Sequence, residues 1–149
     1  MKSKFVFVSG AAKGHVNPMI GVAQTLVERG HEVTWLCFPV SSEQFQRAGL
    51  RAISILEESP PFDFPVDGEG LVQTFADEKR LNSWLRKLLI EAVEPALEQT
   101  RRHLRELNPD VVVFDPMLFV AAIASHLEGK VHVGLSSGLN PVTPEHFEA

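Results

Sequence analysis

One stretch of the sequence decides the fold: Phe5-Val-Phe-Val-Ser-Gly-Ala-Ala-Lys-Gly-His-Val-Asn-Pro18. Residues 5–8 form a short apolar run of Phe and Val, which is typical of a parallel strand covered on both faces. Gly10 and Gly14 bracket a run of small residues in which the backbone turns tightly. The stretch therefore predicts a buried strand, a turn and the beginning of a helix.

The helix is predicted to begin at Pro18. Asn17 is a favourable N-cap, and proline suits the first helical position because its missing N–H would have no partner there. His15 lies just before this cap. Open α/β sheets bind ligands beyond the carboxyl ends of their strands, so a titratable imidazole at this place is a candidate functional group.

The length, composition and net charge of the chain indicate one globular domain without a basic surface. The chain has 149 residues and a net charge of −5, whereas nucleic acids and anionic membranes need a basic partner. Cys37 is the single cysteine, which excludes an intrachain disulfide and favours a reducing compartment. The apolar run before Ser9 is too short for a signal peptide, and no run reaches the ~20 residues of a membrane span. We therefore expect a soluble, cytoplasmic protein.

Strand and helix signals alternate along the chain. The predicted strands are 5–8, 32–38, 51–56, 110–114 and 131–135, and the predicted helices are 18–29, 41–47, 71–107 and 117–127. The first helix should bury Ile20, Ala23, Leu26 and Val27. Pro95 should kink or split the long helix, and the segment 57–70, rich in Pro and Gly, is predicted to be an irregular loop.

This alternation predicts a Rossmann-like, doubly wound parallel sheet of the α/β class in a single domain. The commonest order for such a sheet is three-two-one-four-five, which makes the first and fourth strands neighbours. His15 follows the first strand and Asp115 follows the fourth. The topology therefore predicts that these two side chains, 100 positions apart, face each other where the strand order reverses.

An imidazole beside a carboxylate can act as a general base. The neutral ring accepts a proton at pH 7, and the carboxylate fixes the tautomer and stabilises the imidazolium that forms. No serine or cysteine nucleophile is evident, so the base would activate a substrate hydroxyl or a water molecule. The alternative is structural: His15 would bond to backbone in a turn, and Asp115 would cap the next helix.

Other candidates give weaker signals. Ser136 and Ser137 could present hydroxyls at the same rim or form a plain turn, and Trp84 could line a pocket or belong to the core. Neither a dinucleotide fingerprint nor a P-loop is present around Gly14, which disfavours a nucleotide-dependent oxidoreductase and an ATPase of that type. Cys37 is interpreted as a small buried hydrophobe, and the histidines show no metal-ligand spacing, so no metal site is predicted.

Two motifs resemble those of a known family. Gly14-His-Val-Asn-Pro18, followed by a helix that ends in Glu28-Arg-Gly-His-Glu-Val-Thr34, looks like the opening of the GT-B glycosyltransferases that modify small molecules, especially the bacterial natural-product and macrolide branch. Pro109-Asp-Val-Val-Val-Phe-Asp-Pro116 resembles the fourth strand of that family and the acidic residue after it. The first motif is fairly specific, whereas the second alone would be weak.

The resemblance implies an N-terminal, acceptor-binding domain, residues 1–149, that forms one half of a GT-B enzyme. By position, His15 matches the base that deprotonates the acceptor hydroxyl, and Asp115 matches its acidic partner. The sugar is then transferred with inversion and without a required metal. The acceptor, an apolar small molecule, is expected to meet Gly14, Trp84, Met117, Ser136 and Ser137.

The resemblance also implies a second, C-terminal domain that binds a nucleotide-sugar donor, a UDP- or dTDP-sugar. Nothing in the sequence matches that domain's nucleotide motif, so the chain is expected to be truncated, to bind no cofactor itself and to transfer no sugar alone. An exposed interdomain face should cause weak self-association. The alternative is a non-catalytic Rossmann-like module that binds a small molecule or a protein.

Overall fold

A five-stranded parallel sheet forms the centre of the computed structural model, which describes residues 1–10, 12–38, 42–56 and 68–137. The strand order is β3-β2-β1-β4-β5, and every neighbouring pair is parallel. The strands are β1 (Lys4–Val8), β2 (Glu32–Cys37), β3 (Arg51–Ser54), β4 (Val111–Phe114) and β5 (His132–Gly134). The predicted doubly wound sheet and its order are therefore confirmed.

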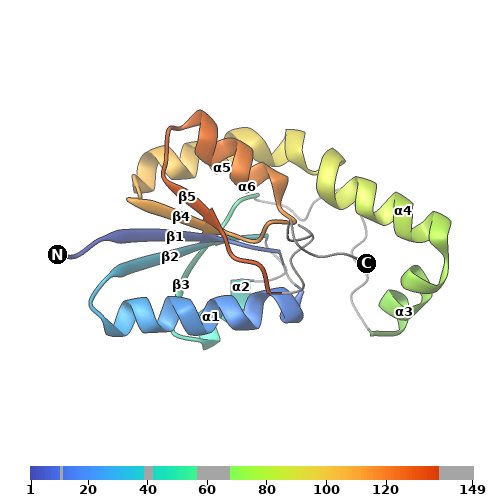
Figure 1. Cartoon of the computed structure of the whole chain (residues 1–149), viewed down its shortest axis with the longest axis horizontal. Helices are drawn as coiled ribbons and strands as arrows, with labels where there is room; N and C mark the ends of the chain where they lie inside the picture. Colours follow the sequence, from blue (N-terminus) through green and yellow to red (C-terminus); the bar gives the residue numbers. More distant parts are fainter. Residues whose placement is uncertain (11, 39–41, 57–67, 138–149) are drawn as a thin grey trace, which may run out of the picture.

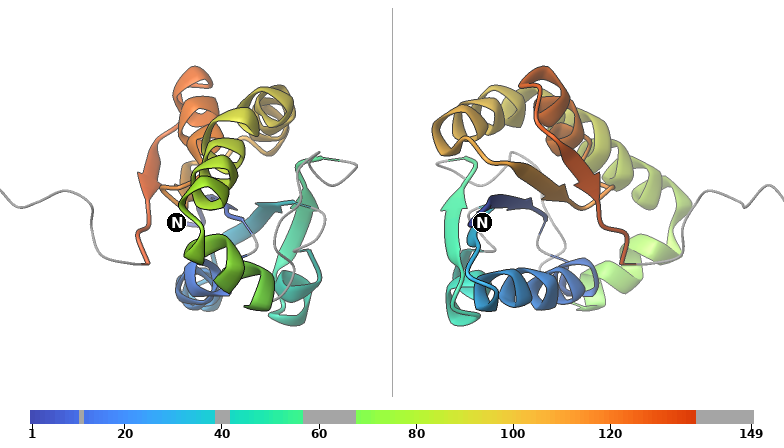
Figure 2. Two further views of the ribbon diagram at one scale, coloured as in Figure 1. Left: turned by 90° about the vertical axis from the view of Figure 1, so that its right-hand side faces the viewer. Right: turned by 60° about the vertical axis from the view of Figure 1, so that its left-hand side comes forward.

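Helices cover both faces of the sheet (Figure 1). On one side lie α1 (Lys13–Glu28) and α2 (Ser42–Arg47), and on the other lie α5 (Val93–Leu107) and α6 (Phe119–Leu127). Two further helices, α3 (Gly68–Ala76) and α4 (Glu78–Arg86), extend past the carboxyl ends of the strands, in front of the sheet in the left view of Figure 2. We call this end of the sheet the carboxyl edge.

The apolar side chains form two cores because alternate strand residues point to opposite faces. Val6 and Val8 of β1 pack against the α5–α6 side, whereas Phe7 packs against the α1 side. The rings of Trp35 and Phe45 stack at 4.3 Å in the α1-side core. Burial on both faces explains why the sequences of the three central strands, β1, β2 and β4, are mostly hydrophobic.

Helix α1 begins earlier than the sequence predicts, at Lys13 rather than Pro18. Ala12 takes the N-cap position without a side-chain cap, and its carbonyl accepts the amides of His15 and Val16 at 2.9 and 3.0 Å. Pro18 lies inside the helix, where only the carbonyl four residues earlier loses a donor. His15 is consequently a residue of the first helical turn and not of a loop.

The buried face of α1 also differs in part from the prediction. Val16, Met19 and Ala23 are buried, whereas Val27 is 44% exposed. The early start of the helix adds Val16 to the apolar face. Val27 lies in the last turn of α1.

The segment 57–70 is helical in part. Residues 57–67 lie outside the described residues, and residues 68–70 form the first turn of α3 instead of a loop. Within α3 the carbonyl of Gly70 accepts the hydroxyl of Thr74 at 2.8 Å, and the acidic Glu69 lies at the positive end of the helix dipole.

The predicted long helix is divided into α3, α4, a π-helical segment η2 (Lys87–Glu91) and α5. Asp77 begins α4 by accepting the amides of Lys79 and Arg80. The break expected at Pro95 lies one turn earlier, in η2, where the amide of Ala92 donates to the carbonyl of Lys87 at 2.9 Å. Pro95 itself lies in the first turn of α5, where a missing N–H is tolerated.

Candidate functional site

Asp115 follows β4 directly and is held by backbone contacts at the carboxyl edge. Its amide donates to the carbonyl of Val8 at 3.0 Å, which extends the β1–β4 ladder by one bond. Its Oδ1 accepts the amide of Met117 at 3.0 Å, and its side chain is only 9% exposed. The carboxylate therefore has a fixed orientation, with its second oxygen directed away from the turn.

That second oxygen meets His15. The Nδ1 atom of His15 lies 3.0 Å from Oδ2 of Asp115, and the imidazole side chain is 37% exposed. When Nδ1–H donates to the carboxylate, the neutral ring keeps a free electron pair on Nε2. The predicted meeting of the two side chains is thus confirmed, and the pair is chemically able to accept a proton from a molecule at the edge.

The fold explains why residues so distant in sequence meet. β1 and β4 are neighbours in register, with Val8 beside Phe114, so the residues that follow them leave the sheet at the same place. β1 leads into α1, and β4 leads into α6. Between these two strands the chain order reverses, which is where open α/β sheets form their ligand crevice.

Ser9, which the sequence did not single out as a site residue, stabilises the chain where it leaves β1. Ser9 is fully buried after β1, and its hydroxyl accepts the indole N–H of Trp35 at 2.9 Å. The same hydroxyl donates to the carbonyl of Gly10 at 3.3 Å. The signal is a small hydroxyl residue after a buried strand with a tryptophan in the next strand, because a buried indole N–H needs an acceptor.

The remaining predicted site residues come from different elements at the carboxyl edge. Gly14 precedes His15 in the first turn of α1, and the Met117 amide is bonded to Asp115. Ser136 and Ser137 follow β5, which is next to β4. Gly14 thus adjoins His15 along the chain, and Met117 adjoins Asp115 through a hydrogen bond.

Trp84 lies in α4 beyond the edge. Its half-buried ring meets Phe75 of α3 edge to face, with ring centroids 6.1 Å apart. Its indole N–H is buried, and within the described part of the chain it has no hydrogen-bond partner. Because Val72 and Phe75 of α3 are 69% and 59% exposed, the α3–α4 pair presents apolar surface beyond the strands.

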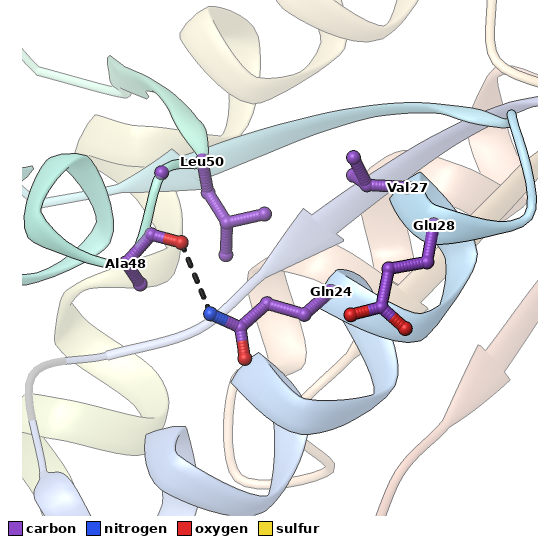
Figure 3. A pocket seen from close by; sticks show the side chains of 6 residues that line it. Gln24, Val27, Glu28, Ala48 and Leu50 are labelled. Carbon is purple, nitrogen blue, oxygen red and sulfur yellow. Dashed lines mark hydrogen bonds between the residues drawn. The ribbon is translucent and has the colours of Figure 1, made fainter.

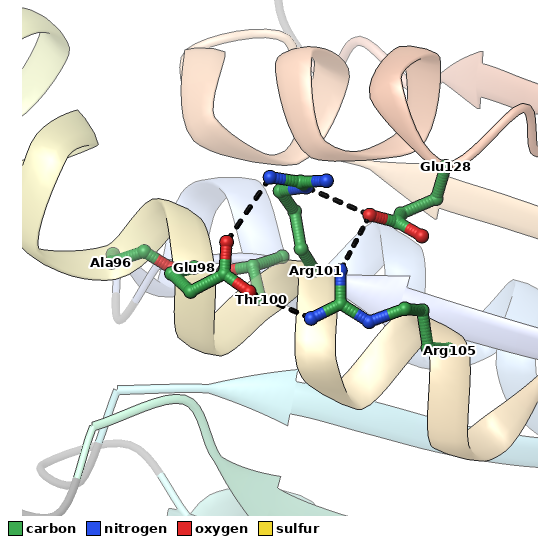
Figure 4. A network of polar contacts seen from close by, with 6 residues as sticks. All are labelled: Ala96, Glu98, Thr100, Arg101, Arg105 and Glu128. Atoms are coloured by element: carbon green, nitrogen blue, oxygen red, sulfur yellow. Dashed lines mark hydrogen bonds and ion pairs between the residues drawn. The ribbon is translucent and has the colours of Figure 1, made fainter.

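A second cluster of charges joins α5 to α6 (Figure 4). Glu128 accepts Nε of Arg101 at 2.7 Å and Nη1 of Arg105 at 2.8 Å, and Glu98 pairs with both arginines. The hydrogen bond from Arg101, helped by the charge of Arg105, lowers the pKa of Glu128. The arginines remain charged at all physiological pH values, so this cluster is an inter-helix clamp without a group that exchanges protons near pH 7.

One surface hollow in the described part of the chain lies away from the His15–Asp115 pair. A surface hollow of about 260 Å³ lies between the end of α1 and the residues after α2, lined by Gln24, Val27, Glu28, Ala48, Gly49 and Leu50 (Figure 3). Gln24 donates across it to the carbonyl of Ala48 at 3.1 Å. It is more than two helical turns of α1 away from His15.

The described part of the chain shows neither a metal-ligand cluster nor a membrane-spanning helix. Among residues 1–10, 12–38, 42–56 and 68–137, no three His, Cys, Asp or Glu side chains gather as a metal site would require. No helix in these ranges is long and apolar enough to cross a bilayer. Cys37 is a buried thiol in β2, with Sγ 3.8 Å from the carbonyl of Ile53.

Comparison with known proteins gives one consistent result. The pattern of the Glycosyltransferase family 28 N-terminal domain matches residues 5–133. Oleandomycin glycosyltransferase of Streptomyces antibioticus is 32% identical over 129 residues, which are 87% of this chain and 28% of that enzyme.

Solved structures show the same fold. The calicheamicin glycosyltransferase CalG4 superposes with a TM-score of 0.71 at 22% identity, over 99% of this chain and 35% of that one. The glycosyltransferase VinC, solved in complex with dTDP, gives a TM-score of 0.67 at 19% identity, over 92% of this chain and 35% of that one. The chain thus spans about a third or less of the length of these relatives.

Proposed function

Because the chain belongs to the Glycosyltransferase family 28 N-terminal domain family, we propose that it forms the acceptor-binding part of an inverting glycosyltransferase, with His15 as the general base and Asp115 as its partner. The observation that carries the proposal is the 3.0 Å contact between Nδ1 of His15 and Oδ2 of Asp115 at the carboxyl edge. The substrate would be a hydroxyl group of an apolar small molecule.

The proposed reaction is a displacement at the anomeric carbon of the donor, with His15 as the base. The hydroxyl of the acceptor gives its proton to Nε2 of His15, and the imidazolium that forms is stabilised by the Asp115 carboxylate. The hydroxyl oxygen attacks the anomeric carbon of the donor from the face opposite the leaving group. The bond to the nucleoside diphosphate breaks, the diphosphate keeps the electron pair, and the sugar is inverted.

The acceptor would lie between the base and the α3–α4 pair. The His15–Asp115 pair or the neighbouring end of β5 is bordered by Gly14, Met117, Ser136 and Ser137. Trp84 would cover the acceptor from α4. Exposed Val72 and Phe75 support an apolar acceptor, since such a face gains free energy when it is covered.

The donor would be a UDP- or dTDP-sugar held by a C-terminal donor domain, as the dTDP in the VinC structure suggests. The chain alone is therefore expected to bind no nucleotide and to transfer no sugar. Turnover by the purified chain with a nucleotide-sugar would contradict this division of roles. A cytoplasmic location is part of the proposal, consistent with a single cysteine, which cannot form a disulfide within the chain.

Weak self-association is the last part of the proposal. The sequence places it on the interdomain face, and the structure adds an exposed apolar stripe at the β5 edge of the sheet: Phe119, Ile123 and Leu127 of α6 with Val131 and Val133. Sedimentation at increasing concentration measures it, and an ideal monomer at high concentration would contradict it.

The role of the base is tested in an enzyme that joins this chain to a donor-binding domain. His15→Ala should lower turnover about 10²–10⁴-fold while acceptor affinity stays nearly unchanged. His126→Ala, which removes an exposed imidazole from α6, is the matched control and should leave turnover unchanged. A change in affinity alone for His15→Ala would instead favour a binding module without catalysis.

A further inference from the structure

Gly134 of β5 lies against the turn that carries Asp115. It pairs with Phe114, the last residue of β4, and the amide of Leu135 donates to the Phe114 carbonyl at 2.8 Å. A Cβ atom added to Gly134 would stand 3.2 Å from Cγ of Pro116 and 3.7 Å from the Phe114 ring. The first distance is shorter than ordinary van der Waals contact, so Pro116 would have to move by a few tenths of an ångström.

The need for glycine here concerns space and not backbone conformation. The described glycines with positive φ are Gly30, Gly49 and Gly129, and Gly134 is not among them. By contrast, a Cβ on Gly21 of α1 would meet nothing within 4 Å. An alanine at Gly134 therefore changes the position of Pro116 without straining its own backbone.

Pro116 lies within the turn that orients the carboxylate. The Asp115 carbonyl accepts the amide of Leu118 at 2.8 Å, and its Oδ1 accepts the amide of Met117 at 3.0 Å. The proline ring fixes its own φ, so a shift of the ring is passed to the residues on either side. A displacement of a few tenths of an ångström is large against the 2.7–3.2 Å range of a good hydrogen bond.

We infer that Gly134 is a positioning residue for the His15–Asp115 pair: its missing side chain lets Pro116 rest against β5, and this sets Asp115 Oδ2 at hydrogen-bond distance from His15 Nδ1. Only the catalytic meaning of this inference rests on the proposed function. The structural claim concerns the pair itself.

The test reads the tautomer of His15 in the purified chain by nitrogen NMR at high pH, where histidine rings are neutral. In the wild type the Nδ1–H tautomer should dominate because Asp115 accepts that proton. Gly134→Ala should raise the population of the Nε2–H tautomer at least two-fold. Gly21→Ala, which adds a methyl group in open space, should leave it unchanged. An unchanged tautomer ratio in folded Gly134→Ala would overturn the inference.

A double variant separates positioning from general damage. Pro116→Ala removes the Cγ atom that the new methyl group would meet, so Gly134→Ala/Pro116→Ala should recover the wild-type tautomer ratio. If Gly134→Ala does not fold, the double variant should still fold and show the wild-type tautomer ratio. A double variant that does not fold, or that shows another ratio, overturns the inference. No substrate is needed, so the result is independent of whether His15→Ala abolishes transfer.

Discussion

Two carboxylates in this chain, Asp115 and Glu128, are almost equally buried, but they contact different kinds of partner. The side chains of Asp115 and Glu128 are 9% and 11% exposed. Glu128, at the end of α6, meets two guanidinium groups, whereas Asp115 meets a single imidazole and a backbone amide. The burial of a carboxylate therefore does not decide its role, but the partner to which it is bonded does.

The difference lies in which partners can change charge. Arg101 and Arg105 keep their protons at every physiological pH, so the Glu128 cluster holds the same charges throughout and connects α5 to α6. An imidazole, by contrast, can accept a proton on its free ring nitrogen, and the side chain of His15 is 37% exposed, so a molecule in solution can reach it. The comparison predicts that changes at Asp115 affect chemistry and changes at Glu128 affect only stability.

The largest expected effect tests this division directly. In an enzyme that carries this chain and a donor-binding domain, Asp115→Asn should lower turnover at least about 10²-fold, because an amide stabilises neither the required tautomer nor the imidazolium. Glu128→Gln should leave turnover unchanged. Steady-state kinetics of both variants, normalised to folded protein, makes the comparison. Equal losses in the two variants would remove the distinction between the two carboxylates.

A second prediction concerns what holds α5 on the sheet. Leu104 of α5 is fully buried in the core, so Leu104→Ala should lower the free energy of unfolding by about 2–5 kcal/mol. Leu127→Ala, at a position 53% exposed on α6, should have a small effect. Glu128→Gln should cost less than Leu104→Ala in urea unfolding. A larger loss for Glu128→Gln would mean that the clamp, and not the apolar core, attaches the helix.

A third prediction uses pH, through another histidine of α5. Burial and then the charge of Arg102 lower the pKa of His103, despite an opposing contribution from Glu106. The unfolded chain therefore binds a proton that the folded chain does not, in the window just below about pH 6.5. Stability should be complete above that pH and should fall as the pH decreases from 7 towards 5.

Urea unfolding over this pH range measures the slope. His103→Gln should flatten it, whereas His126→Gln, at an exposed position of α6, should not. An unchanged slope in His103→Gln would show that its burial does not couple folding to protonation. The Glu128 cluster would not supply the slope, because the lowered pKa of Glu128 places its titration at more acidic pH.

The smallest expected effect is a dependence on salt. The ion pairs of Glu98 with Arg101 and Arg105 are largely exposed, and screening weakens such pairs. Raising the ionic strength should therefore lower the stability of the wild type slightly more than that of Glu98→Gln, which lacks these pairs. Thermal unfolding at low and high sodium chloride concentration measures the difference, and the reverse order would contradict a clamp of charges.

The contact between His15 and Asp115 could be predicted from the sequence because it depends on strand order, and the order is inferred from short apolar runs that alternate with helices. The start of α1 could not be predicted in this way. Asn17 and Pro18 are a strong local signal for a helix start, but the amides of His15 and Val16 bond to the Ala12 carbonyl without any side-chain cap. The local preference for a start at Pro18 is overridden because the longer helix also buries Val16.

Other features depend on contacts that no local pattern reports. Gly134 looks like any glycine in a short strand, and its meaning comes from Pro116, which lies earlier in the chain. Ser9 gains its role only through the indole of Trp35 in the neighbouring strand. The sequence therefore predicted which residues form the pair but not the contacts that hold the pair in place.

The π-helical segment η2 joins α4 to α5, so its length sets the direction of α4 relative to α5. Each residue of a helix turns the chain by about 100°, so one residue gained or lost within Lys87–Glu91 re-aims everything before it. Ala96 and Leu104 of α5 would stay on the sheet, whereas α4 and its Trp84 would point in a new direction. Variation in a single turn is thus a short evolutionary route to a different shape above the strands, with the base and its partner left unchanged.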